Sequence, residues 1–388
     1  MASIRKRPWV DRSGKQHVAW QVSYLDQRGK RRRKQFARRK DADSFLVRAR
    51  SEVEAGIHNV DRESITVREA GDIWIDSCKL GRGGRNGVEL HTLRQYQQHL
   101  EHHIAPLIGS RLLSKLTTPE VMAFRDDLLR TRSRTMAKKI MTSFKAILGE
   151  AQMRGLVAQN VASVVSVTNV GRHKSNIQIP TRTDIKSILS EVEKKANCAK
   201  SKGWRQYQIF LTTAVLTGMR ASELRGLKWE NIDLLQGSIT VRQRADERGF
   251  IGALKSMAAR RNIDIPPHLV QLLCEWKLAC PPGSLDLVFP NGNGNVEALA
   301  NLHSRYWKPL LTECGFIDDD GRSLFKFHSL RHFRASALIA AGASPKEVMT
   351  EIGHSSITLT FDTYGHLFPE DTSERKSRAA ALAADIMH

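Results

Sequence analysis

The stretch IGHSSITLTFDTYGH, residues 352–366, sets His354 and Tyr364 in a run rich in serine and threonine. The chain has 388 residues and only five tyrosines. A tyrosine phenol, with a pKa of about 10, is almost wholly protonated at neutral pH and is therefore an uncommon nucleophile. Tyr364 is either a packing residue or a residue that reacts, and the remaining sequence must discriminate between the two.

The overall composition favours a polyanionic partner. The chain carries 61 Lys and Arg against 40 Asp and Glu, a formal net charge of +21, as is typical of proteins that bind nucleic acid. An anionic membrane surface would attract the same charge, but no apolar run approaches the roughly 20 residues that a spanning helix needs. The polar start MASIRKRPWV also lacks the apolar segment of a signal peptide. We expect an intracellular protein that binds nucleic acid and does not enter a membrane.

The cysteines and histidines form no metal-binding pattern. The five cysteines are scattered without a CxxC pair, so we expect free thiols rather than disulfides or zinc ligands. His102 and His103 are adjacent, but adjacent helical residues point in different directions, and no HExxH motif is present. We therefore expect no metal site.

The first segment, residues 1–58, is strongly basic and strand-like. Its first 55 residues hold 16 Lys and Arg against 6 Asp and Glu. SIRKRPWV, HVAWQVSYL and RRRKQFA predict three short antiparallel strands, and DADSFLVRARSEVEAG predicts a helix. Val18, Trp20, Val22 and Tyr24 alternate on one predicted face. A basic sheet of this kind can place one face in a DNA groove, and the candidate DNA contacts are Arg5, Lys6, Arg7, Arg31, Arg32, Arg33 and Lys34.

The second segment, residues 65–168, has helical periodicity. TVREAGDIWIDSCK, HTLRQYQQHLEHHIAPLIG, TPEVMAFRDDLL and RTMAKKIMTSFKAILGEAQMRG predict four helices, and Thr118-Pro119-Glu120 is a good helix start. A basic stripe on the last helix and just before it is a candidate phosphate contact, although ordinary exposed helix charge explains each single position nearly as well. Its members are Arg132, Arg134, Lys138, Lys139 and Lys145, of which we select Arg134, Lys138 and Lys139 as DNA contacts.

The third segment, residues 175–388, mixes helices and hairpins. A helix is predicted at 184–196, a buried helix at QIFLTTAVLTG, and β-hairpins between residues 231 and 266, followed by further helices. The length and the hydrophobic content of 41% suit two or three domains with real cores. The predicted fold is thus multidomain and mainly α with small β elements: a three-stranded sheet plus helix, an all-α domain and an α+β domain.

Two further motifs in the third segment carry candidate chemistry. In LTGMRASELRGLKW, Gly218 allows the backbone to turn so that Arg220 projects from a helix start, and Glu223 lies three residues on, on the same face. In FHSLRHFRASAL, His328 and Arg331 are also three residues apart and therefore share a helical face. An arginine supplies a bidentate, permanent charge and an imidazole can exchange a proton, so the pair suits a phosphate.

In order along the chain, these motifs resemble the tyrosine recombinase (phage integrase) family. The matching text is TGMRASEL, then HSLRH, then IGHSS with the later YGH, and ALKSMAARRNIDIP matches the β-hairpin that carries the family's lysine, here Lys255. Six positions in four motifs agree in order. The resemblance is strong over residues 175–388. It extends to 65–168 as the core-site DNA-binding domain and, more weakly, to 1–58 as an arm-type DNA-binding domain like that of lambda-type integrases.

The resemblance implies that the protein is an enzyme that cuts and rejoins DNA. Tyr364 would attack a phosphodiester, leaving a 3′-phosphotyrosine and a free 5′-hydroxyl. Arg220 and Arg331 would bind the non-bridging oxygens and stabilise the transition state. Lys255 would protonate the departing 5′-oxygen.

The other residues of the family pattern complete this set. His328 would take part in proton transfer with the nucleophile, His354 would hydrogen-bond the phosphate, and Glu223 would brace the site. An arginine-rich pocket is expected to favour the phenolate of Tyr364. The covalent bond stores the phosphodiester energy, so no ATP or other cofactor is implied, and the chain has no GxxxxGK[ST] loop.

The resemblance also implies partners, and it leaves rival functions open. The partners are double-stranded DNA at core and arm sites, a homotetramer on that DNA, a host DNA-bending protein and an excisionase, all in the bacterial cytoplasm at the nucleoid. A type IB topoisomerase shares the attacking tyrosine, and a non-catalytic DNA-binding regulator would share the fold. A structural basic protein would explain the charge alone. The two-part N-terminal DNA-binding region and the GHSS…T…Y spacing favour the recombinase.

Overall fold

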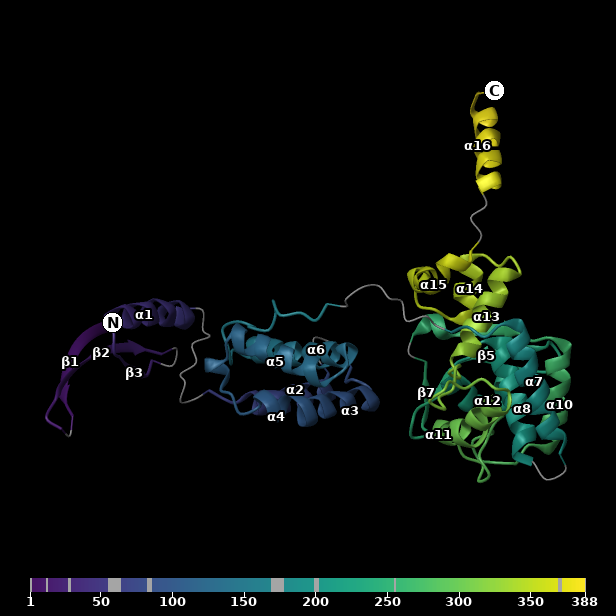
Figure 1. The fold of residues 1–388 in the computed structure, drawn as a ribbon, viewed down its shortest axis with the longest axis horizontal. Coiled ribbons are helices and arrows are strands. Elements are labelled where there is room, and N and C mark those ends of the chain that lie inside the picture. The colour runs from purple at the N-terminus through teal and green to yellow at the C-terminus, as the bar shows by residue number, and fades with distance from the viewer. Residues whose placement is uncertain are drawn as a thin grey trace. The chain divides into compact units, whose positions relative to one another are not determined.

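The computed structural model divides into two compact units, Met1–His173 and Lys174–His388 (Figure 1). The residues it describes are 2–11, 13–26, 29–54, 64–81, 86–168, 178–198, 202–254, 256–368 and 372–387. Lys255 and most of the residues between the three predicted segments lie outside these ranges. Residues 2–54 and 64–168 each have a separate apolar core, while the exact domain boundaries remain a prediction. No helix in the described ranges is long and apolar enough to cross a membrane.

The basic N-terminal segment folds as the predicted sheet and helix. Its strands pair antiparallel in the order β1-β2-β3, and α1 lies along one face of the sheet (Figure 1). The core between them includes Val22, Tyr24 and Phe45. Val18, predicted on the same face of the strand, lies outside this core and is 44% exposed. The elements are β1 (Ser3–Val10), β2 (Gln16–Leu25), β3 (Arg31–Phe36) and α1 (Arg39–Glu54).

The strand register places two of the predicted DNA-binding residues on the helix-covered face. Lys34 pairs with the buried Val22 and therefore shares its face, and Arg32 lies two residues earlier on the same face. Arg32 donates a 2.7 Å hydrogen bond to Asp26, and the Lys34 ammonium lies 4.8 Å from the centroid of the Phe45 ring. Both side chains are engaged within the module, which differs from the DNA contact predicted for them.

The opposite face of the sheet carries the remaining arginines. Arg5 pairs with Gln21, and Arg33 pairs with Ser23, on the side away from α1. The exposed arginines of this open face are Arg5, Arg7, Arg31 and Arg33. Lys6 pairs with Trp20 on the side of α1, but its own side chain is exposed. The open face therefore holds an arginine group suited to phosphate contacts.

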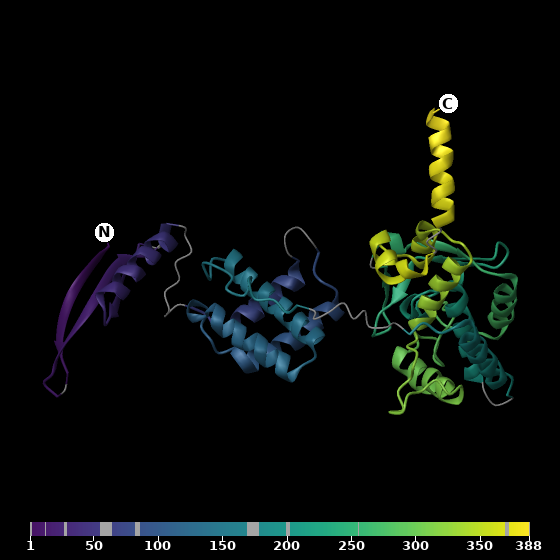
Figure 2. The same ribbon diagram turned by 45° about the horizontal axis from the view of Figure 1, so that its top comes forward.

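Residues 64–168 form a helical bundle, in which α5 and α6 lie against α2 and α3 (Figures 1 and 2). The predicted second helix is continued by a π-helical turn, Leu100–Ile104, and by the short α4 (Ala105–Ile108). The predicted start near Thr118 is correct to one residue, because Thr117 is the N-cap and donates from its N–H and its hydroxyl to the Glu120 carboxylate. The four long helices are α2 (Val67–Leu80), α3 (Leu90–His99), α5 (Thr118–Thr131) and α6 (Arg134–Met153).

The basic stripe of α6 is only partly open. Arg134 donates to the Thr168 carbonyl at 3.0 Å, and Lys145 donates to the Ser163 carbonyl at 3.0 Å. These contacts hold the segment that follows α6. Lys138 and Lys139 are exposed and stay predicted DNA contacts.

The second unit combines helices with two small sheets, as predicted. Strands β4, β5 and β8 form one sheet and β6 and β7 a hairpin. The main core lies between the β4-β5-β8 sheet and the helices, and the hairpin packs in a smaller cluster. The elements are α7 (Arg182–Asn197), α8 (Lys202–Thr217), α9 (Ala221–Arg225), β4 (Ile232–Asp233), β5 (Ser238–Val241), β6 (Gln243–Ala245), β7 (Ile251–Ala253), β8 (Arg261–Asp264), α10 (Pro267–Ala279), α11 (Leu299–Leu302), α12 (Lys308–Glu313), α13 (Ser329–Ala340), α14 (Pro345–Ile352), α15 (Ile357–Tyr364) and α16 (Thr372–Met387).

The packing of the helical bundle generates a stability prediction. Phe144 is 0% exposed and packs on Phe124 with ring centroids 5.2 Å apart. Phe144→Ala is expected to destabilise the bundle by about 3–5 kcal/mol, because it removes buried apolar surface and leaves a cavity. Met153→Ala on the same helix is the control, since Met153 is 71% exposed. Hydrogen exchange of the α5 and α6 amides in the full chain measures the stability of the bundle in both variants. Equal destabilisation by Phe144→Ala and Met153→Ala would contradict the assigned core.

Candidate active site

A glycine turn between α8 and α9 positions the first predicted arginine. Gly218 follows the last residue of α8 with φ +64°, and an added Cβ there would lie 2.9 Å from both Arg334 Cγ and Ile352 Cδ1. Both the backbone conformation and the close packing therefore require glycine. Arg220 is the N-cap of α9. The predicted projection of Arg220 from a helix start is confirmed.

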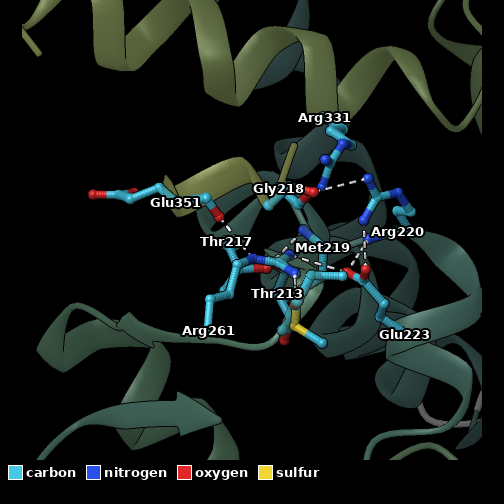
Figure 3. Close-up of polar contacts among 11 residues, drawn as sticks. Thr213, Thr217, Gly218, Met219, Arg220, Glu223, Arg261, Arg331 and Glu351 are labelled. Atoms are coloured by element: carbon cyan, nitrogen blue, oxygen red, sulfur yellow. Dashed lines mark hydrogen bonds and ion pairs between the residues drawn. The ribbon is translucent and has the colours of Figure 1, made fainter. Parts of the chain in front are cut away.

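The buried Glu223 carboxylate joins two arginines (Figure 3). Glu223 is 1% exposed and accepts from Arg220 Nη1 at 2.7 Å and from Arg261 Nη2 at 3.0 Å. Arg261 also donates to the Glu351 carbonyl at 2.7 Å, which ties β8 to α14. Burial alone would raise the pKa of Glu223, but Arg261 and Arg220 hold it below its ordinary value. Glu223 is thus a carboxylate at neutral pH and keeps Arg220 in place.

Arg331 on α13 is almost completely buried, with an exposure of 3%. Its Nη1 donates to the Gly218 carbonyl at 2.9 Å (Figure 3), whereas its Nη2 has no hydrogen-bond partner among the described residues. Burial and the nearby Arg220 lower the pKa of Arg331 to about 9, so it stays cationic at pH 7. A buried N–H without an acceptor is costly. An anion beside Arg220 and Arg331 would supply that acceptor.

Two histidines lie one turn apart at the start of α13. His328 is the exposed N-cap residue, and the His332 ring stands edge-on to it, with centroids 5.0 Å apart. Partial desolvation by the surrounding protein, together with His332, Arg331 and Arg220, lowers the pKa of the His328 imidazole to about 4. His328 is therefore neutral at pH 7 and has one N–H to donate and one nitrogen to accept.

Tyr364 ends α15 and is 1% exposed. Its hydroxyl lies 2.7 Å from Nδ1 of His332. The His354 ring is nearly parallel to the phenol, at 5°, with centroids 6.2 Å apart, and its Nδ1 lies 2.9 Å from Thr360 Oγ1. Burial, with Arg331 and Arg220, lowers the pKa of His354 to about 4. The tyrosine is thus enclosed by two neutral imidazoles.

The structure contradicts the expectation that the pocket favours the phenolate of Tyr364. Burial raises the pKa of Tyr364 to about 12, and the positive charge of Arg331 offsets only part of that rise. A charged phenolate is disfavoured in a pocket that excludes water. Tyr364 is therefore a protonated phenol in the protein without DNA.

The structure brings most of the predicted site residues together. Six of the seven meet there, namely Arg220, Glu223, His328, Arg331, His354 and Tyr364, and Arg261 of β8, which the sequence analysis did not include, joins them through Glu223. Lys255 follows β7 and lies outside the described residues. In the ranges that the structure describes, no group of three or more His, Cys, Asp or Glu side chains could hold a metal ion.

His332 is a further site residue that the sequence analysis missed. It lies within the quoted HSLRH motif, directly after Arg331 and four residues after His328. The spacing of four residues places it on the same helix face as His328. This spacing is the sequence feature that indicates His332 as a candidate site residue. The contact with Tyr364 depends on how α15 packs against α13, which no local pattern contains.

These features define the class of protein. A buried phenol beside two arginines, one with an unpaired N–H, has the chemistry that phosphoryl transfer to tyrosine would require, and it lies in a basic, multidomain chain. The class is the tyrosine recombinases. A sequence model of the phage integrase family matches residues 178–371, half of the chain, and the chain belongs to this family.

Individual relatives and solved structures agree with this family. A XerC-like tyrosine recombinase of Caldanaerobacter subterraneus subsp. tengcongensis is 26% identical, over 97% of this chain and 97% of the relative. The ICEBs1 integrase of Bacillus subtilis is 25% identical, over 74% and 77%. The Tn1549 transposon integrase, solved in complex with a circular intermediate DNA, has a similar fold, with a TM-score of 0.65 at 18% identity over 82% of this chain and 100% of the other. The protein is a site-specific DNA recombinase of the integrase type.

The Glu223 network generates a second stability prediction. Glu223→Gln leaves Arg261, whose side chain is 2% exposed, without its carboxylate, and is expected to cost about 3–5 kcal/mol. The control is Glu351→Gln, because the Glu351 side chain pairs with Arg334 at a half-exposed position and should cost at most about 1 kcal/mol. Urea unfolding of the second unit measures both, and a small effect of Glu223→Gln would contradict the bracing role.

The lowered pKa of Glu223 also predicts a pH dependence. A carboxyl whose folded pKa lies below its unfolded value stabilises the protein fully above the unfolded value and loses this contribution as the pH falls through the folded one. The wild type should therefore lose stability on acidification from pH 4.5, the ordinary pKa of the group. Glu223→Gln should show a smaller loss over this range. Parallel curves for the two proteins would contradict the assigned ion pairs.

Proposed function

We propose that Tyr364 cleaves one DNA strand at an attachment site, forming a 3′-phosphotyrosine bond and a free 5′-hydroxyl, and that a second 5′-hydroxyl reverses the step. Exchange of four strands in this way integrates or excises a mobile element. The observation that carries the proposal is the buried, unpaired Nη2 of Arg331 in the pocket that also holds Arg220 and the Tyr364 phenol.

The two arginines bind the scissile phosphate. Arg331 Nη2 and the part-exposed guanidinium of Arg220 donate to the non-bridging oxygens. Their charge stabilises the additional negative charge of the pentavalent transition state, and groups that are already in position need no reorganisation during the reaction. Glu223 and Arg261 hold Arg220 in this position.

The remaining roles follow from the family pattern together with the contacts. Lys255, just after the β6–β7 hairpin, protonates the departing 5′-oxygen. His328 and His354 are neutral at pH 7 and donate hydrogen bonds to the phosphate. For His328 this replaces the expected proton transfer with the nucleophile, because the Tyr364 hydroxyl contacts His332 instead. The covalent bond conserves the phosphodiester energy, so resealing requires no nucleotide cofactor.

The proposal extends to the assembly on DNA. A lambda integrase tetramer has been solved on a Holliday junction, with a TM-score of 0.58 to this chain at 18% identity over 90% of this chain and 96% of the other. Four active sites are needed to exchange four strands, so we expect four copies of this chain on two duplexes. Residues 65–168 and the second unit would hold the core site, and residues 1–58 an arm site. A host bending protein and an excisionase would then control the direction, in the bacterial cytoplasm at the nucleoid.

The cleavage proposal is tested with a nicked DNA that carries the attachment site. Wild-type protein is expected to form a covalent adduct, seen in denaturing gels without ATP or divalent metal, whereas Tyr364→Phe is expected to form none, because it lacks the attacking oxygen. Tyr306→Phe is the control for removal of a hydroxyl elsewhere in the second unit, and it should form the adduct. An adduct with Tyr364→Phe would disprove the assignment, and a two-site assay distinguishes recombination from relaxation by a topoisomerase-like activity.

The open face of the N-terminal sheet generates a binding prediction. Arg33→Ala should weaken DNA binding and reduce the slope of log affinity against log salt by about 1, because one phosphate contact is lost. Arg32→Ala should leave the slope unchanged and destabilise the module, because Arg32 pairs with the buried Asp26. Salt titrations of DNA binding measure the slopes. If Arg32→Ala alone changed the salt slope, the DNA would bind the other face of the sheet.

A further inference from the structure

The Tyr364 hydroxyl has a single hydrogen-bond partner in the described part of the chain, which is Nδ1 of His332 at 2.7 Å. The two rings are tilted by 59°, with centroids 5.7 Å apart. Tyr364 lies in a small apolar cluster with Ala335 and Ile339 of α13. The packing of Tyr364 in this cluster, which also contains Val348 and Ile352 of α14, therefore fixes the phenol oxygen against this nitrogen.

The neighbouring histidines are engaged differently. His354 directs its Nδ1 to Thr360 at 2.9 Å, and its ring lies parallel to the phenol. His328 stands edge-on to His332 and is exposed. Of the three imidazoles around Tyr364, His332 is the one placed to receive its proton.

The surroundings of His332 favour an imidazole that accepts. Burial and the adjacent Arg331 lower the pKa of His332, so the ring is neutral at pH 7 and has one bare nitrogen. With the proton on Nε2, Nδ1 accepts from the phenol O–H. The phenol is itself protonated at neutral pH, and attack by its oxygen therefore requires an acceptor for that proton.

We propose that His332 is the general base of strand cleavage, taking the proton of Tyr364 as the phenol oxygen attacks phosphorus. This role rests on the proposed function, and it replaces His328 as the residue that exchanges a proton with the nucleophile. It also gives a function to a histidine that the family motifs used above did not single out.

The step balances in both directions. In cleavage, the Tyr364 proton passes to His332 Nδ1, the Oη–P bond forms, and the P–O5′ bond breaks as the 5′-oxygen receives a proton from Lys255. In resealing, a 5′-hydroxyl gives its proton to Lys255 and attacks phosphorus. The Oη–P bond then breaks, and the phenol oxygen takes back the proton from His332.

The test measures the single-turnover rate of adduct formation on the nicked DNA with two substitutions. His332→Ala removes the acceptor and should slow the step about 10²–10⁴-fold, the usual contribution of a general base. His332→Asn retains an amide oxygen near the position of Nδ1, which can orient the phenol but cannot hold a proton at neutral pH. His268→Ala, at an exposed position on α10, is the control, and circular dichroism confirms folding of each variant.

The outcomes separate a proton acceptor from a positioning residue. We expect slow cleavage by both His332 variants. We also expect added imidazole to accelerate His332→Ala but not His268→Ala. A wild-type rate with His332→Asn would assign positioning alone and overturn the proposal. A wild-type rate with His332→Ala, or no response of this variant to imidazole, would also overturn it. If the wild type itself forms no adduct, the proposed function fails instead.

A substrate with a sulfur leaving group distinguishes this base from the general acid. A 5′-thiolate departs without a proton, so a DNA with sulfur at the bridging 5′ position should restore the rate of Lys255→Ala. On the same DNA, the rate of His332→Ala relative to that of the wild type should stay as low as on ordinary DNA. Restoration of His332→Ala by the sulfur substrate would place His332 on the leaving-group side and contradict the proposal.

Discussion

The buried ion pairs of Glu223 are the interaction on which the catalytic unit depends. One carboxylate that is 1% exposed accepts hydrogen bonds from Arg220 and Arg261, and Arg261 continues to the carbonyl of Glu351 at the end of α14. Gly353, which follows α14 with φ +69°, lies against Arg261, where an added Cβ would be 3.0 Å from Nη1. A single charge network therefore sets the distance between the arginine pocket and the segment that leads to the nucleophile.

This network leaves the pocket with unbalanced positive charge. Glu223 carries one negative charge against the two positive charges of Arg220 and Arg261. Arg331 is buried with an unpaired nitrogen, and the surrounding histidines are neutral at pH 7. The proposed function assigns a DNA phosphate as the anion that this pocket binds. Tyr364 meanwhile stays protonated and hydrogen-bonded to His332. In the proposed mechanism the proton acceptor is therefore already in place, and the attack awaits only a bound phosphodiester.

Local patterns in the sequence predict the elements well, and they predict Arg220 and Glu223 because both depend on one turn of helix. The alternation in β2 predicts a sheet, but not that Arg32 pairs with Asp26 or that Lys34 covers Phe45, since register and the placement of α1 decide which basic residues stay open. The pKa of Tyr364 was misjudged because charge was counted without burial. His332 was missed because its role arises only where α15 packs on α13.

The most direct test of the central claim locates the covalent bond itself. The adduct with nicked attachment-site DNA is digested with nuclease and protease, and the peptide that carries the nucleotide is sequenced by mass spectrometry. The account predicts a nucleotide joined through its 3′-phosphate to Tyr364. A nucleotide on any other residue, or one joined through a 5′-phosphate, would contradict the assignment of the nucleophile and of the pocket built around it.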